Sequence, residues 1–137
     1  GRLTKLLDSL GGADLCVGGI GINGHLAFNE PKKEMSTAEF SALTARVLEI
    51  SPETRTANAI GDLNGAIEDM PRYAITIGMH EILGAKRVRI GVFRQWHRAV
   101  VRRAACGEAG SQFPASLLQN HPDAMILAND VASERAV

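Results

Sequence analysis

Short apolar runs alternate with amphipathic segments along this chain of 137 residues. Five runs are rich in apolar residues and have the length of buried strands: 14–17, 45–50, 73–77, 87–93 and 124–128. Segments with helical signals lie between most of them. Strands that alternate with helices predict an α/β fold, with a mostly parallel sheet and helices on both of its faces. The length predicts a single domain over residues 1–137.

The predicted helices are bounded by ordinary capping signals. Ser51 is a favourable N-cap, and Pro52 follows it at the first helical position. Apolar residues at positions 3, 6, 7 and 10 have helical spacing, and two glycines then end that pattern. We predict further helices over 78–83, 95–106, 114–120 and 130–136. The polar segment 32–39 is predicted to be a mobile lid or an exposed turn.

Composition excludes several classes of function. Lys plus Arg equals Asp plus Glu, and aromatic residues make up only 4% of the chain, so neither a nucleic-acid nor another polyanion surface is indicated. The two cysteines have no metal-ligand spacing and form no disulfide framework. The apolar runs are much shorter than a membrane span, and no signal peptide is recognisable. We therefore expect a cytoplasmic protein with no membrane or nucleic-acid partner.

Residues 18–31, with the sequence GGIGINGHLAFNEP, form the segment with the strongest chemical signal. Three glycines, Gly19, Gly21 and Gly24, follow the first predicted strand and allow a ligand to approach the backbone. His25 has an unperturbed pKa near neutrality, and Asn23 and Glu30 are close enough in sequence to orient or tune it. The alternative is a glycine-rich turn in which the histidine only satisfies local hydrogen bonds. Ligands bind at such strand ends in open α/β sheets, so a catalytic loop is the functional interpretation, but these residues alone do not favour it over the turn.

A second candidate segment, RQWHR at 94–98, follows the predicted strand 87–93 and opens a helix. In a parallel sheet it would lie on the same rim as the glycine loop. Helix N-termini and cationic side chains both suit phosphate groups, so this segment is a candidate phosphate site. The alternative is a solvated, basic helix start.

The glycine-loop motif, GIGINGHLAFNEP at 19–31, closely resembles that of the glucosamine-6-phosphate deaminase/isomerase family. Weaker matches follow in TRTAN at 54–58, PRYAITIG at 71–78, and SLLQ at 116–119 with His121. The resemblance implies a Rossmann-like fold and conversion of a 2-amino-2-deoxyhexose 6-phosphate to a ketose phosphate plus ammonia. The related 6-phosphogluconolactonases share the fold, but the AFNEP ending favours the deaminase branch over this hydrolase.

The resemblance also assigns roles to single residues. It implies that His25 opens the sugar ring by moving a proton, that Asn23 and Glu30 hold and tune His25, and that Gly19, Gly21 and Gly24 shape the substrate loop. The family has a phosphate-binding Lys at the start of the later helix, which Arg98 matches if one residue is inserted; otherwise Arg94 or His97 is the better candidate. An Arg that contacts phosphate in the family is replaced by Ile60. This chemistry requires no metal, flavin or nucleotide cofactor.

Family members are roughly twice this length, and the chain begins with Gly1 rather than Met. Their N-terminal half supplies a first phosphate loop and the Asp that abstracts the C2 proton, and neither feature is present here. We therefore expect a C-terminal half that is inactive alone and whose partner is an N-terminal half or a second copy. The rival hypothesis is a noncatalytic sugar-phosphate sensor. Retention of His25 and Glu30 disfavours it, whereas the missing base favours it.

Overall fold

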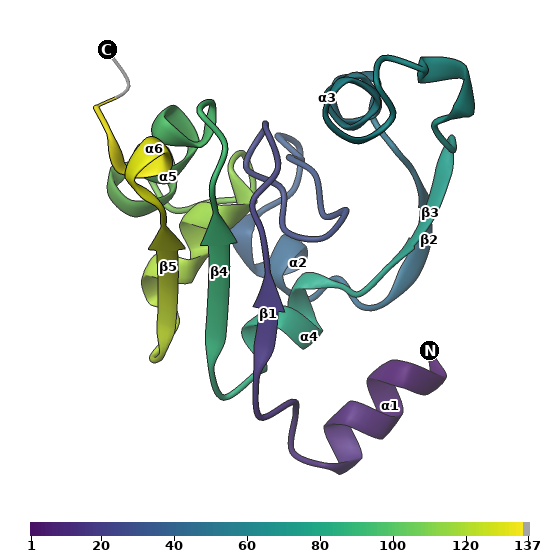
Figure 1. Ribbon diagram of the computed structural model, residues 1–137. Helices are drawn as coiled ribbons and strands as arrows, with labels where there is room; N and C mark the ends of the chain where they lie inside the picture. Colours follow the sequence, from purple (N-terminus) through teal and green to yellow (C-terminus); the bar gives the residue numbers. More distant parts are fainter. Residues whose placement is uncertain (136–137) are drawn as a thin grey trace.

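A computed structural model describes residues 1–135 of the chain (Figure 1). Its main sheet contains three parallel strands in the order β1–β4–β5: β1 (Cys16–Gly18), β4 (Val88–Val92) and β5 (Ala124–Ala128). Cys16 lies opposite Val88, and Val88 lies opposite Ala124. The predicted α/β class and parallel sheet are confirmed.

One face of this sheet is buried under helices. In Figure 1, α5 (His97–Cys106), the 3₁₀ helix η2 (Pro114–Asn120) and α2 (Thr37–Ser41) lie behind the three strands. Alternate β4 residues point into this layer and form the centre of the core with Val100 of α5 and Leu117 of η2: Val88, Ile90 and Val92. The core therefore fixes the position of the loops at the carboxyl ends of β1 and β4.

The opposite face is open over the described residues. Val17, Met125 and Leu127 point away from the core and are 72%, 48% and 54% exposed. Parallel sheets are normally covered on both faces. β1 also pairs only with β4 among the residues that the structure describes, so its other edge is free. The predicted second helical layer is thus not supplied by residues 1–135.

Two predicted strands do not join the main sheet. β2 (Arg46–Glu49) and β3 (Tyr73–Thr76) pair with each other in an antiparallel ribbon. Between them lie α3 (Pro52–Asp62) and the 3₁₀ helix η1 (Ile67–Asp69), and we call the whole segment 46–76 the arm. Val47 and Ile75 are largely exposed, as expected for a ribbon that is not enclosed between two helical layers. Figure 1 shows the arm curving away from β1 and placing α3 at the upper right, level with the loops that follow the strands of the main sheet.

Local capping explains where the helices begin. Ser51 accepts a hydrogen bond from the Thr54 amide and is followed by Pro52, so the predicted start of α3 is confirmed. The segment 32–39, predicted to be a lid or turn, forms a turn over residues 33–35 and then leads into α2, which begins after Ser36. Ser36 and Glu39 form a capping box, and the buried ring of Phe40 anchors this helix.

The remaining helices are short. Helix α1 (Arg2–Ser9) is tied to α4 (Met79–Leu83) because the Thr4 hydroxyl donates to the buried Glu81 carboxylate at 2.5 Å. Helix α6 covers Asp130–Ser133 of the predicted 130–136, and Ala136 lies outside the described residues. Among residues 1–135 no helix has the length and apolar character needed to cross a membrane.

Candidate functional site

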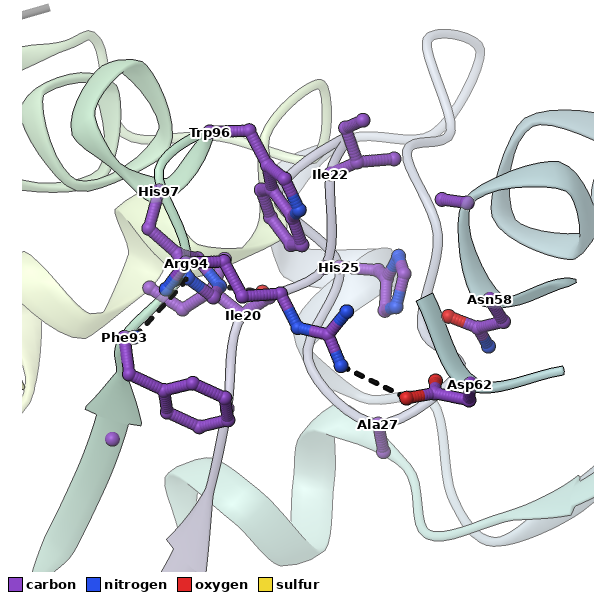
Figure 2. Close-up of a pocket in the computed structure, with 14 residues that line it drawn as sticks. Ile20, Ile22, His25, Ala27, Asn58, Asp62, Phe93, Arg94, Trp96 and His97 are labelled. Carbon is purple, nitrogen blue, oxygen red and sulfur yellow. Dashed lines mark hydrogen bonds and ion pairs between the residues drawn. The ribbon is translucent and has the colours of Figure 1, made fainter. Parts of the chain in front are cut away.

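A pocket of about 280 Å³ lies at the carboxyl ends of β1 and β4. Three segments line it: the glycine loop from Gly19 to Ala27, the loop that joins β4 to α5, and the side of α3 that carries Asn58 and Asp62. Figure 2 shows side chains from all three segments around the same cavity. Parallel topology thus brings the two candidate segments of the sequence to one rim, as predicted, and the arm closes the third side.

His25 lies in this pocket and is only 8% exposed. Its Nδ1 lies 2.7 Å from Asn23 Oδ1, which also accepts the backbone N–H of His25 at 3.3 Å. Because that N–H can only donate, the Asn23 atom facing the ring is the oxygen, and Nδ1 must carry the imidazole proton. Nε2 is then an unprotonated acceptor, and within the described residues it has no protein partner. The loop therefore presents a proton acceptor to the pocket.

Glu30 reaches His25 through an intermediate hydroxyl. Its carboxylate accepts bonds from the Ser51 amide at 2.9 Å, the Ser51 hydroxyl at 2.7 Å and the Thr54 hydroxyl. Thr54 Oγ1 in turn lies 3.4 Å from His25 Nδ1. Since Thr54 donates its proton to Glu30, its lone pair faces the Nδ1–H group. The three predicted residues His25, Asn23 and Glu30 therefore form one connected group, joined by Thr54.

The two titratable groups of this cluster are shifted in complementary ways. Burial lowers the pKa of His25, and the nearby negative charge of Glu30 only partly opposes this effect. Burial alone would raise the pKa of Glu30, but hydrogen bonds from Thr54 and Ser51 outweigh it, so its pKa is lowered. At neutral pH the site contains a neutral imidazole and an ionised carboxylate, which suits proton transfer by His25.

Two of the three predicted glycines are required by their surroundings. A Cβ on Gly21 would lie 1.8 Å from His25 Cε1, so the imidazole packs directly on the backbone there. Gly24 has φ +84°, and a Cβ would meet the ring of Phe113. At Gly19 a Cβ would make only an ordinary contact, so its role is to line the pocket.

Arg98 lies away from the pocket. Its Nε donates to Val131 O at 2.8 Å, and its Nη2 pairs with Glu134 at 2.5 Å. The physical reason is helix phase: α5 begins at His97, which directs Arg98 toward α6 instead of the rim. The structure therefore does not bring Arg98 together with His25, and the inserted residue that aligned Arg98 with the family's Lys is not supported.

Arg94 and His97 take positions at the pocket. Arg94 pairs with Asp62 of α3 at 2.8 Å across the pocket (Figure 2). His97 is buried: its Nε2 donates to Ile20 O at 2.9 Å, and its Nδ1 accepts the Arg94 amide at 2.9 Å. Burial lowers the pKa of His97, so its imidazole is neutral. Its two hydrogen bonds link the two rim loops. Trp96 also lines the pocket, packed 3.9 Å from the His97 ring.

The other histidines have structural partners. His80 Nε2 lies 2.9 Å from Asp8, and His121 Nε2 lies 2.8 Å from Ala85 O. In the part of the chain that the structure covers, no group of three His, Cys, Asp or Glu side chains is arranged to hold a metal ion.

Thr54 joins this cluster although the sequence offers no sign of it beyond its place at the start of the TRTAN match. Asp62 was also missed, because its contribution depends on how α3 folds back over the rim.

Curated proteins similar to this chain are glucosamine-6-phosphate deaminases. The protein of this name from Bacillus velezensis is 38% identical over 133 residues, which cover 97% of this chain and 52% of the relative. Glucosamine-6-phosphate deaminase 1 of Bacillus subtilis is 35% identical, with 96% of this chain and 51% of the relative covered. The chain thus spans about half the length of the curated relatives it matches. No protein-family model matches it.

Solved structures agree with these relatives. A monomeric glucosamine-6-phosphate deaminase superimposes with a TM-score of 0.83 at 33% identity, covering 96% of this chain and 52% of the other. A 6-phosphogluconolactonase from Trypanosoma brucei has a TM-score of 0.66 at 17% identity, which shows a shared fold alone. By sequence and by structure, the chain matches about half of a member of the glucosamine-6-phosphate deaminase family.

Proposed function

We propose that this chain supplies the ring-opening part of a site that converts glucosamine 6-phosphate to fructose 6-phosphate and ammonia. The observation that supports the proposal best is the arrangement of His25, which lines the pocket with its Nδ1–H held by Asn23 Oδ1 and its Nε2 without a protein partner among the described residues. Nε2 accepts the proton of the O1 hydroxyl. As the C1–O5 bond breaks and the C1 carbonyl forms, the imidazolium returns that proton to O5.

Asn23 and Glu30 stabilise this transient imidazolium in different ways. Asn23 orients the ring through a neutral amide and contributes no charge. Glu30 supplies the negative charge, which reaches Nδ1 through the Thr54 hydroxyl. A charge placed behind a hydroxyl leaves His25 neutral at rest and still favours its protonated form during the reaction.

We further propose Arg94, in place of Arg98, as the phosphate ligand contributed by this chain. Its guanidinium lines the same pocket as His25, on the rim where the β4–α5 loop ends. Arginine presents paired donors that match phosphate oxygens. The aromatic rings of Phe93 and Trp96 line the pocket beside it.

The base for the C2 proton lies, in our proposal, in the half of a deaminase that residues 1–137 do not match. Within residues 1–135 the carboxylate that lines the pocket is Asp62, which is paired with Arg94. The open apolar face of the main sheet and the free edge of β1 are the surface on which the other half of a deaminase would pack. Burial of apolar side chains there would drive the association.

The test joins this chain to the part of the Bacillus velezensis deaminase that it does not match. We expect no ammonia release from glucosamine 6-phosphate by the chain alone, and release by the reconstituted pair. His25→Gln should abolish that release while the pair still forms. Robust turnover by the chain alone would show that the base lies in this chain, and a pair that forms with intact His25 but releases no ammonia would contradict the proposed reaction.

Phosphate recognition is tested separately by calorimetric titration of inorganic phosphate. Arg94→Gln should weaken binding about tenfold, as expected for loss of a charge-assisted hydrogen bond, whereas Arg98→Gln should leave it unchanged. The opposite order would restore Arg98 as the phosphate ligand.

A further inference from the structure

The ion pair between Arg94 and Asp62 joins two parts of the molecule that are separate in the fold. Arg94 lies in the loop after β4 of the main sheet, and Asp62 is the last residue of α3 in the arm. Their side chains meet across the pocket (Figure 2), and Arg94 Nη2 lies 2.8 Å from Asp62 Oδ1. We call this pair the latch. It places the one cation we propose for phosphate in contact with a competing carboxylate.

The helix surface beneath the latch is shaped to receive the arginine. Gly61 precedes Asp62 on α3, and a Cβ at Gly61 would lie 2.3 Å from Arg94 Nη1 and 3.3 Å from Cζ. Any larger residue at this position would therefore displace the guanidinium. The absence of a side chain at Gly61 leaves room for the guanidinium to lie directly against the last turn of α3. The Arg94 guanidinium thus lies against the backbone of α3 at Gly61.

The latch is also easy to exchange. The Arg94 side chain is 34% exposed and that of Asp62 is 58% exposed, and ion pairs at such positions contribute little net stability. A phosphate monoester carries more negative charge than a carboxylate and has three acceptor oxygens. It can therefore replace Asp62 as the partner of Arg94, whereas an uncharged sugar cannot.

We propose that Asp62 is a positioning residue that holds Arg94 against α3 in the empty site and is displaced when a phosphate monoester binds. This inference rests on the phosphate role of Arg94 proposed above. Asp62 lowers phosphate affinity by competing for the same donors, and it keeps the guanidinium extended over the pocket. When Asp62 is displaced, the ion pair no longer links α3 to the rim of the main sheet.

The test compares Asp62→Asn with Glu53→Gln, using inorganic phosphate as the probe at fixed ionic strength. Glu53 lies at the other end of α3, about 13 Å along the helix axis, so its removal controls for a general change in charge. We expect Asp62→Asn to bind phosphate three- to tenfold more tightly than wild type, and Glu53→Gln to differ by less than twofold. Asp62→Glu, which keeps the competing charge, should restore the weaker binding.

Hydrogen exchange supplies a second readout. In the phosphate-free protein, Asp62→Asn should accelerate exchange of the α3 amides, and Glu53→Gln should not. Unchanged or weaker phosphate binding by Asp62→Asn would overturn the latch. If Arg94→Gln weakens phosphate binding but Asp62→Asn does not strengthen it, the latch fails and the phosphate site stands; if Arg94→Gln has no effect, the phosphate role itself fails.

Discussion

At the scale of single residues, the site separates orientation from charge. The amide of Asn23 fixes the tautomer of His25, and the carboxylate of Glu30 acts from behind the Thr54 hydroxyl. Thr54 is fully buried, and it donates to one partner while its lone pair faces the other. Loss of this hydroxyl would leave both neighbours incompletely satisfied.

Thr54→Val tests this arrangement because it removes the hydroxyl and keeps the shape of the side chain. We expect a loss of about 1–3 kcal/mol in the free energy of unfolding, the usual cost of unsatisfied buried polar groups. Urea denaturation measures it. Thr56→Val is the matched control, since Thr56 lies on the same helix and its hydroxyl bonds only the exposed Pro52 carbonyl. Equal effects of the two substitutions would contradict the role of Thr54.

The burial of His97 predicts that the stability of the protein depends on pH. Its pKa in the folded protein lies below the ordinary value of 6.5, so below about pH 6.5 the unfolded chain binds more protons than the folded one. Above pH 6.5 the contribution of His97 to the free energy of unfolding is therefore fully present. It decreases as the pH falls toward the pKa of the folded protein, by at most about 1.4 kcal/mol per pH unit.

We expect His97→Gln to be less stable than wild type at pH 8, because the Arg94 amide loses its acceptor. Between pH 7 and pH 5.5 the variant should lose less stability than wild type does. Thermal melts across this range measure the difference, and parallel pH profiles for the two proteins would contradict a buried neutral His97.

The structure brings predicted site residues together where they are close in sequence. His25, Asn23 and Glu30 lie within one loop, and the structure joins them through Thr54, which comes from the arm. The prediction for Arg98 depended on the rotational phase of α5, because the first residue of a helix determines which way each of its side chains points. A shift of two residues, from 95 to 97, was enough to direct its side chain to α6.

At the scale of elements, Ser51 couples the folding of α3 to the construction of the site. Its hydroxyl accepts the Thr54 amide as an N-cap and donates to Glu30, and its own amide also donates to Glu30. The start of α3 and the position of the carboxylate are therefore set by the same side chain. This explains how the arm, which is separate from the main sheet, is held in register with the glycine loop.

Ser51→Ala should destabilise the protein by about 1 kcal/mol through loss of the N-cap. It should also slow ammonia release by the reconstituted pair, because Glu30 loses a partner. Ser36→Ala is the matched control: Ser36 caps α2 in the same way, and its hydroxyl bonds only Glu39. If both substitutions reduce stability but neither changes turnover, Ser51 acts only as a cap.

Sequence patterns predicted the existence of most elements but not every pairing. Helix α3 was predicted because its Ser-Pro start is a local signal. The pairing of β2 with β3 was not, because strand partners depend on contacts between distant residues. Helix α2 was missed since only Phe40 is buried in it and five residues give too little periodicity.

At the scale of the whole molecule, the open sheet face is the dominant feature. Val17, Met125 and Leu127 form an apolar surface beside the free edge of β1, a combination that promotes association with another chain. The fold class was predictable from alternating strands and helices. The uncovered face was not, because apolar residues on a strand do not reveal whether a second layer covers them.

Val17→Glu tests this surface. Val17 is mostly exposed, so we expect the secondary structure of the chain to be unchanged by circular dichroism. Binding to the complementary deaminase half should weaken at least tenfold in sedimentation experiments, because a charge would have to be buried without a partner. Ile67→Glu, at an exposed apolar residue on η1, is the control and should bind normally. Similar binding by both variants would place the interface elsewhere.

The order β1–β4–β5 also determines when the sheet can assemble during synthesis. Pairing of β4 with β5 closes a loop of about 35 residues, whereas pairing of β1 with β4 closes one of about 70, and each doubling costs roughly 0.6 kcal/mol of chain entropy. Among the three described strands of the main sheet, β1, which leads into the glycine loop, is synthesised first, yet it has no neighbour among these strands until β4 has been made. His25 therefore joins its site late, when the second half of the chain has already provided the sheet on which β1 docks.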